Sequence, residues 1–250
     1  MDEYPSTADR TRTSQEEEAK PRRTLLDIIN NKVGKEKKII LRLCVLLRLT
    51  DSLANTNEIP GVFDEAFVDI KNSGDRHTGI LLKYPVYILA VIESSYEGIF
   101  GILSSLAKQL DSGDRITHGK ILNINVNTQF RYFDNWSVKD LKLVAPRIEA
   151  DFSTAEPLES IVSEVVVQLN SIGLYVSLIT PNKLQKELEA MQERIPEAIV
   201  SQDVLGWLLF NEQVLSPNQY IKTYASPFAT TLASGKLFNQ RFVIHFFICF

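Results

Sequence analysis

Hydrophobic and polar positions follow two different periods along the first half of the chain. Apolar runs at residues 39–49, 78–84 and 86–93 have the length of strands, and the last two meet at Tyr84-Pro85, which predicts a hairpin. Between and after these runs, apolar residues recur every three or four positions, which predicts two amphipathic helices. The two helical stripes consist of Phe63, Ala66, Phe67 and Ile70, and of Ile99, Leu103, Leu106 and Leu110.

Start and stop residues define the predicted ends of these two helices. Pro60 suits the first position of a helix, and Gly74 stops the first stripe. Ser94 and Glu97 have the spacing of a capping box at the start of the second helix, and Gly113 follows its last turn. Both helices are therefore bounded by residues that the sequence supplies locally.

Two further strands complete the predicted domain. Residues 122–127 alternate strictly between apolar and polar, so we expect one buried and one wet face, and residues 138–144 form a fifth strand. The order strand, helix, strand, strand, helix, strand, strand predicts an α+β, ferredoxin-like sheet with two helices on one face. We assign this domain to residues 39–146.

The second half of the chain reads as a helical extension over residues 147–227. Its longest stripe is predicted to cover the open face of the sheet and consists of Leu158, Ile161, Val165, Leu169 and Ile172. Residues 1–38 are polar and charged and read as a flexible arm. Residues 228–250 end in an uncharged apolar tail, for which a terminal strand, a docking segment and an alternative terminus all remain open.

Composition narrows the classes of function. With 44% hydrophobic and 23% charged residues the chain can form a globular core, and its net charge of −4 gives no general attraction to nucleic acid or anionic membrane. The apolar runs look strand-sized, so we expect no membrane span. No secretory signal is recognisable at the start, which favours the cytoplasm.

Candidate chemistry is sparse. His77, His118 and His245 have no partner at metal-ligand spacing, and Cys44 and Cys249 lie inside apolar runs typical of reduced, buried thiols. No phosphate-binding loop or nucleophile elbow is present in the sequence. We predict no catalytic residue and no metal site.

Two carboxylates near the hairpin receive an equally plain interpretation. Asp75 and Glu93 flank the two strands, and charged residues at such places are usually solvated. We expect both to be surface charges without a catalytic role.

Three stretches resemble the BLUF domain, the flavin-binding blue-light sensor module. Residues 77–82, running into residues 86–93, are similar to its strand motif I-T-G-L-L…L-Q-V-L-E, and residues 131–138 are similar to its loop motif R-x-F-x-x-W-x-M. The alignment places Ala90 at the glutamine and Val45 at the tyrosine that the photocycle of that module requires. A methyl group neither donates nor accepts a hydrogen bond, and an isopropyl group cannot give an electron to an excited flavin.

The resemblance implies a vestigial cofactor pocket. Asn72 occupies the place of an asparagine that holds the flavin carbonyl, Trp136 matches the loop tryptophan, and Val138 replaces the usual methionine. We therefore expect no bound cofactor. The alternatives are that Asn72 merely closes a helix and Trp136 covers a sheet edge, or that some other flat ligand still binds.

A longer resemblance leads to the testis-expressed protein 47 family. Residues 80–93, the Trp136 loop, and residues 158–175 and 215–224 are similar to that family over residues 39–227. The resemblance implies a non-catalytic interaction protein of sperm flagella or motile cilia, attached to the axoneme and bound to other axonemal proteins. Two rivals remain: a flavin- or nucleotide-binding light or redox sensor, and, ranked last, an enzyme that uses a cleft of the sheet.

The partner-binding surface is predicted within residues 201–224, because residues 204–210 are apolar all round and Tyr220, Ile221 and Tyr224 add an aromatic edge. The proposed contacts are Val204, Leu205, Trp207, Leu208, Tyr220 and Tyr224. The alternative is a helical subdomain buried on its own chain. If the surface serves a partner, a chain cut after Gly173 should keep a folded core and lose its docking.

Overall fold

The computed structural model describes residues 39–54, 61–141, 156–224, 230–231 and 237–238. The predicted arm at residues 1–38, Pro60, and His245 and Cys249 in the tail lie outside the described residues. The helix predicted to open at Pro60 begins only at Asp64, because residues 61–63 are not helical.

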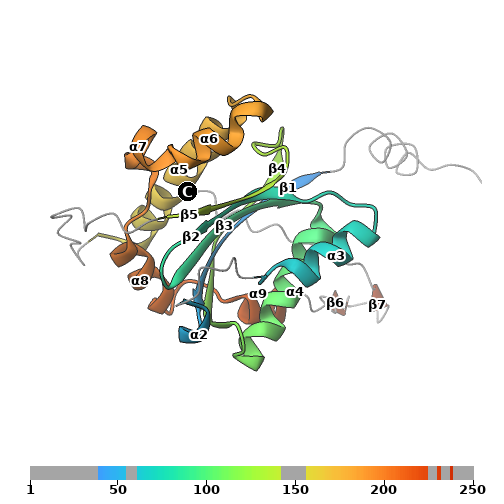
Figure 1. The fold of residues 1–250 in the computed structure, drawn as a ribbon. Coiled ribbons are helices and arrows are strands. Elements are labelled where there is room, and N and C mark those ends of the chain that lie inside the picture. The colour runs from blue at the N-terminus through green and yellow to red at the C-terminus, as the bar shows by residue number, and fades with distance from the viewer. Residues whose placement is uncertain (1–38, 55–60, 142–155, 225–229, 232–236, 239–250) are drawn as a thin grey trace, which may run out of the picture. The chain divides into compact units, whose positions relative to one another are not determined.

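The first half of the chain has the predicted α+β order. Its elements are β1 (Ile40–Leu49), α2 (Asp51–Ala54), α3 (Asp64–Asn72), β2 (Thr78–Lys83), β3 (Tyr87–Ser94), α4 (Tyr96–Ser112), β4 (Ile116–Thr128) and β5 (Trp136–Asp140). The strands form one mixed sheet in the order β4-β1-β3-β2-β5, in which only the β2–β5 pair is parallel (Figure 1). The predicted hairpin is the β2–β3 pair, so the fold class is confirmed.

The second half is helical, as predicted. It contains α5 (Leu158–Ser177), η1 (Pro181–Lys183), α6 (Leu184–Glu189), α7 (Met191–Arg194), η2 (Pro196–Ala198), α8 (Gln202–Phe210) and α9 (Pro217–Tyr224). Two short strands, β6 (Thr230–Thr231) and β7 (Leu237–Phe238), pair with each other as a separate two-stranded sheet.

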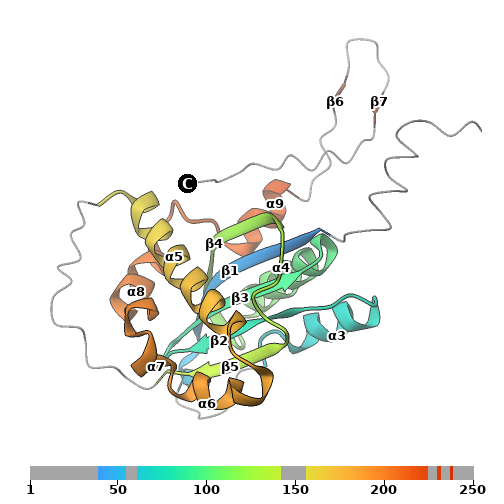
Figure 2. The ribbon, with the colours of Figure 1, turned by 90° about the horizontal axis from the view of Figure 1, so that it is seen from above.

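The sheet is covered on both faces. The α3 and α4 helices pack on one face, where the buried side chains include Phe63, Phe67, Ile99, Leu103 and Leu106. The α5 and α8 helices pack on the other face, and Figure 2 shows α5 crossing over the strands. The predicted stripe of α5 is confirmed, because Ile161, Val165, Leu169 and Ile172 are buried and Leu158 is partly buried.

The start of α4 lies one residue later than the capping box predicts. The Ser95 hydroxyl, not that of Ser94, accepts the backbone N–H of Gly98 at 3.1 Å. Ser94 is still paired with Leu41 in the sheet, so it cannot adopt the cap position. The predicted end is confirmed, since Gly113 closes α4 in the left-handed conformation with φ 69°.

The strict alternation predicted for the fourth strand is wrong. The register of β4 against β1 shifts between Cys44 and Val45, and the extra residue in β4 is Leu122. Leu122 is therefore buried under α5, while Ile121 and Ile124 face the α4 layer. The fifth strand also differs from prediction, because β5 begins at Trp136, where it pairs with Gly79 of β2.

The α5 helix corrects the expectation that no apolar segment is long enough to span a membrane. Its 20 residues make it the one helix in the described part of the chain that could cross a bilayer by length and composition. A helix in a protein core passes the same test, and one face of α5 carries the core stripe described above.

The end of the extension wraps around the edge of the sheet at β4. The backbone N–H of Ile121 donates to the carbonyl of Leu215 at 2.8 Å, and Lys120 Nζ donates to the carbonyl of Val214 at 2.7 Å. After this crossing, α9 lies beside α4, where Asn218 Nδ2 donates to Asp111 Oδ1 at 2.6 Å. Residues 201–224 thus contact the layers on both faces of the sheet and its β4 edge.

Gly173 allows α5 to approach the loop before β5. A Cβ atom at this position would lie 2.4 Å from Tyr132 Cδ2, and the Arg42 guanidinium already lies over the Tyr132 ring, 3.6 Å from its centroid. The ring therefore has little room to yield.

We expect Gly173→Ala to lower the free energy of unfolding by about 1–3 kcal/mol through overpacking. Gly101→Ala in α4 is the matched control, since a Cβ there meets nothing within 4 Å. The control should be neutral or raise stability by about 0.5–1 kcal/mol. Urea titrations of both variants give the comparison, and equal effects would contradict the close packing of Gly173.

Candidate functional site

The two positions that carry photochemistry in the resembling module lie opposite each other in the sheet. Val45 of β1 pairs directly with Ala90 of β3, and both side chains are 0% exposed on the face covered by α3 and α4. Neither side chain has a hydrogen-bonding group or a redox-active ring. At this place the sheet presents a packed apolar core.

Of the other three positions, Trp136 and Val138 belong to the same apolar layer as this pair, and Asn72 does not. Asn72 is exposed at the last residue of α3, so its role as a helix-closing residue agrees with the structure. Trp136 and Val138 lie on the edge strand β5 and are partly buried against the α3 layer. The five positions are thus divided between a sealed core, a strand edge and a solvent-exposed helix end.

Trp136 belongs to a cluster of rings at that edge. Its indole meets Phe63 and Phe67 edge-on, with ring centroids 5.7 and 4.8 Å away, and His77 stacks on Phe67 at 4.0 Å. Burial, with smaller effects from the positive charges of Arg131 and Lys71, lowers the pKa of His77. The imidazole therefore behaves as a neutral ring in this cluster.

The backbone at Gly79 makes room for the Trp136 indole. Gly79 has φ 154°, and a Cβ there would lie 2.1 Å from the carbonyl oxygen of Val91 and 3.0 Å from Trp136 Cζ3. Only glycine fits, because both the conformation and the space exclude a side chain. The indole thus covers the sheet edge, in agreement with the structural alternative for this residue.

We expect Trp136→Ala to lower the free energy of unfolding by about 3 kcal/mol, the low end for such a truncation because the ring is only partly buried. Thermal melts of the two proteins test this. A ligand platform would give the opposite pattern, with an unchanged melting temperature and lost binding.

The main polar cluster of the described residues centres on Glu93, which is 0% exposed. Its carboxylate accepts from Arg42 Nε at 2.9 Å, lies 2.7 Å from Arg42 Nη2, and accepts from Thr78 Oγ1 at 3.0 Å. It also accepts the backbone N–H of Tyr132 at 2.9 Å and of Phe133 at 3.4 Å. The expectation that Glu93 is a solvated charge is wrong, because its charge is neutralised and bonded inside the protein.

This carboxylate fixes the loop that precedes β5. Arg131 strengthens the attachment, since its Nη1 donates to the carbonyl of Glu93 at 2.7 Å and to Thr78 Oγ1 at 2.9 Å. Arg42 Nη2 donates to the carbonyl of Phe130 at 3.2 Å. The conspicuous loop motif of residues 131–138 is therefore explained by hydrogen bonds to two neighbouring strands.

Asp75 is also less solvated than predicted. It is half-buried and accepts a hydrogen bond from the Ser95 hydroxyl, the residue that caps α4. A sequence signal for the Glu93 cluster did exist, because Arg42 and Glu93 each interrupt an apolar strand. Charges within buried strands are expected to pair.

The six predicted partner contacts are divided by the structure. Leu205 and Leu208 are 0% exposed in the core beneath α8, so these two side chains cannot present a docking surface, and the intramolecular alternative holds for them. Val204 and Trp207 are partly buried beside them. The two tyrosines lie on the other side of the sheet, where Tyr220 is partly buried and Tyr224 is exposed.

Those two tyrosines belong to α9. Their ring centroids are 4.7 Å apart, and Tyr224 is 36% exposed. Tyr220 packs against the α4 layer, and its burial raises its pKa. Partner binding stays a prediction for the exposed part of this helix.

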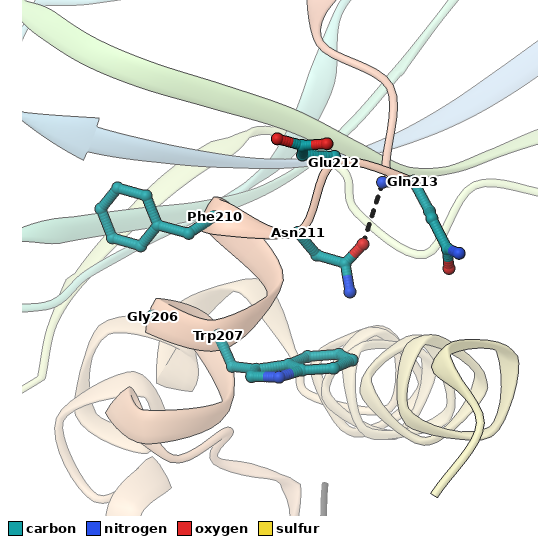
Figure 3. A pocket seen from close by; sticks show the side chains of 6 residues that line it. All are labelled: Gly206, Trp207, Phe210, Asn211, Glu212 and Gln213. Carbon is teal, nitrogen blue, oxygen red and sulfur yellow. Dashed lines mark hydrogen bonds between the residues drawn. The ribbon is translucent and has the colours of Figure 1, made fainter.

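A shallow cavity of about 740 Å³ lies at the end of α8 (Figure 3). It is lined by Gly206, Trp207, Phe210, Asn211, Glu212 and Gln213. Asn211 Oδ1 accepts the backbone N–H of Gln213 at 2.9 Å, which ties up part of its polar lining. The lining has one carboxylate and lacks a nucleophile or a paired base.

Other chemistry has little support. Among the described residues, no three His, Cys, Asp or Glu side chains come together as metal ligands. Burial raises the pKa of Cys44 to about 12, so its thiol is protonated at neutral pH and is not a nucleophile. His118 is exposed, where its ring meets Phe210 edge-on at 5.0 Å.

Comparison with known proteins gives a family and a set of similar structures. The sequence model of the family described as testis-expressed protein 47 matches residues 39–226. A structure titled BlrP1 BLUF matches with a TM-score of 0.32 and 16% identity, over 62% of this chain and 90% of that chain. BlsA in its photo-activated state matches with a TM-score of 0.31 and 16% identity, over 65% and 97% of the two chains.

A third match is part of a larger protein. A bacterial light-regulated adenylyl cyclase matches with a TM-score of 0.31 and 17% identity, over 60% of this chain and 39% of that one. Likenesses at these scores carry no conclusion about activity.

Proposed function

This chain belongs to the testis-expressed protein 47 family, and from that premise we propose that it is a non-catalytic interaction protein of sperm flagella or motile cilia. In this proposal it resides in the cytoplasm of the flagellum or cilium, is attached to the axoneme and binds other axonemal proteins. Neither nucleic acid nor membrane is among its proposed partners.

The observation that carries the proposal is the sealed pair of Val45 and Ala90. A flavin sensor of the resembling type needs a tyrosine and a glutamine at these places, in contact with the ring. Here both side chains are 0% exposed and pack into the core beneath α3 and α4. What supports an interaction protein is therefore that the sensor positions have become part of the hydrophobic core.

Two buried groups support the proposal that the protein is non-catalytic. The buried carboxylate of Glu93 is occupied by Arg42, Thr78 and two backbone N–H groups, so it has no free capacity to act as a general base. Cys44 is protonated and buried. These groups stabilise the fold.

We expect the full-length chain, mixed with excess flavin, to show no light-induced red shift of the flavin absorption band. The tyrosine–glutamine photocycle cannot run with Val45 and Ala90. Absorption spectra before and after blue illumination test this. A reversible shift would favour the sensor instead.

The location is tested by expressing the tagged full-length chain in ciliated cells. We expect the tag along the ciliary shaft and retention with the axoneme after detergent extraction of the membrane. An excess of the same tag alone is the control. Full release with the detergent-soluble fraction would contradict axonemal attachment.

A further inference from the structure

Large apolar side chains are exposed on the outer face of α5, between polar residues. Val167 is 59% exposed and Leu174 is 52% exposed, and Leu178, directly after the helix, is 78% exposed. The opposite face of the same helix carries the core stripe. Exposed apolar residues that recur along one side of a helix are typical contacts for a second helix.

The exposed residues of α5 have the spacing of a helix–helix seam. The seam alternates steps of four and three residues; its members are Ser160, Glu164, Val167, Ser171 and Leu174 of α5 and Leu178 directly after it, and three of the six are apolar. This is the spacing by which one helix packs along another, and Ser171 in the middle is small enough for a close approach. An isolated exposed leucine needs no explanation, but a row in this register predicts a second helix.

A groove runs along the first half of this seam. It has a volume of about 590 Å³, lies between α5 and η2, and is lined by Ser160, Ser163, Glu164, Val167, Gln168, Ser171, Ile195, Glu197 and Ala198. Gln168 Nε2 donates to the carbonyl of Glu197 at 3.2 Å and fixes the two walls together. The groove thus has three apolar side chains, from Val167, Ile195 and Ala198, among polar ones, and this hydrogen bond joins its two walls.

The charges of the groove define its occupant. Glu164 and Glu197 are the ionisable residues of its lining, both are exposed, and both are acidic. An aliphatic helix flanked by Lys or Arg would complement them, whereas an acidic helix would be repelled. An anionic lipid surface would also be repelled, although α5 has enough length and apolar character to be compatible with lipid.

We propose that the outer face of α5 and the η2 groove bind a basic amphipathic helix of a partner protein, with its aliphatic seam on Val167, Leu174 and Leu178 and its Lys or Arg side chains on Glu164 and Glu197. This inference rests on the proposed role as an interaction protein and names its surface. It replaces the buried Leu205 and Leu208 as the predicted contact.

A synthetic peptide provides the first test. The probe is a fluorescently labelled peptide of three Lys-Leu-Ala-Lys-Leu-Lys-Ala heptads. The control peptide has Glu in place of every Lys. Binding to the full-length chain is measured by fluorescence anisotropy. We expect Glu164→Lys/Glu197→Lys to weaken binding of the Lys peptide about tenfold and to strengthen binding of the Glu peptide.

Two further variants locate the contact. Val167→Ser should weaken binding of the Lys peptide about three- to tenfold, because it removes an exposed apolar side chain that the seam and the groove share. Glu193→Lys, an exposed charge on α7 outside the groove, should change binding by less than about twofold. If Glu193→Lys changed binding of the Lys peptide as much as Glu164→Lys/Glu197→Lys, the proposal would be overturned.

Lipid is tested separately. If the chain sediments with phosphatidylcholine–phosphatidylserine vesicles and Val167→Ser abolishes this, the face binds membrane and the proposal is overturned.

The same charge reversal is tested in ciliated cells. If Glu164→Lys/Glu197→Lys loses axonemal retention there, the proposal is supported. If the variant is retained like the unchanged chain, the assignment of the groove is wrong, although the chain is attached to the axoneme. If the unchanged chain is itself not retained, the proposed axonemal attachment is contradicted instead.

Discussion

Replacing Glu93 by glutamine is expected to lower the free energy of unfolding by about 3–5 kcal/mol, a large share of the total stability of an ordinary domain. The substitution keeps the shape of the side chain and removes its charge. Arg42, which is 5% exposed, is then left as a buried charge without its counter-ion.

The amide also has the wrong polarity for this site. Every recorded partner of the Glu93 carboxylate is a donor, from Arg42, Thr78, Tyr132 and Phe133, and the glutamine NH₂ group would face at least one of them. A donor facing a donor costs about the desolvation of an unsatisfied group. The loop before β5 should loosen with the core.

The control for this variant is Glu97→Gln, which changes an exposed carboxylate in the first turn of α4. Its effect should stay within about 0.5 kcal/mol. Urea unfolding of the two variants gives the difference. If Glu93→Gln were as mild as the control, the buried ion pair would have no structural role.

A double-mutant cycle separates the ion pair from the loop hydrogen bonds. Arg42→Met combined with Glu93→Gln should cost less than the sum of the single changes, because no uncompensated charge remains. The two N–H groups of Tyr132 and Phe133 still face an altered acceptor, so recovery should be incomplete. Additive single effects would contradict a direct coupling of Arg42 and Glu93.

A chain cut after Gly173 is expected to fail to fold, contrary to what the helical pattern alone suggests. The cut removes a set of buried core side chains, which comprises Val176, Leu188, Met191, Ala198, Val200, Leu205, Leu208, Leu209 and Val214. Each buried aliphatic side chain contributes about 1.5–3 kcal/mol, so their joint loss exceeds the stability of a typical domain.

Polar partners are lost in the same cut. The Tyr84 hydroxyl, whose burial raises its pKa, donates to the carbonyl of Val200 at 3.1 Å, and Ile121 loses its bond to Leu215. We expect circular dichroism of the fragment to lack a cooperative melt. A fragment that melts cooperatively near the temperature of the full chain would show that the extension is dispensable for folding.

The matched control ends the chain after residue 227. It keeps every element of the five-stranded sheet and all the helices that cover it. This chain should melt cooperatively. Comparison of the two truncations separates a requirement for the extension from a general effect of shortening the chain.

The sequence by itself determined which segments are strands and helices in the first domain. The periods of the apolar residues predicted the hairpin of β2 and β3 and the stripes of α3 and α4, because burial of one face imposes a local repeat. That Val45 and Ala90 have no hydrogen-bonding or redox-active group was also readable, since it depends on residue type alone. The stripe that covers the second face of the sheet followed the same rule.

Only the tertiary structure decided the roles of residues whose partners are distant in the chain. Glu93 meets Arg42 across 51 residues, so no local pattern distinguishes it from a solvated carboxylate. Likewise, the bulge at Leu122 depends on the register against β1. Whether the apolar α8 is a docking surface or a core element depends on what lies beneath it. That is the sheet, whose strands lie on the order of 100 residues earlier in the sequence.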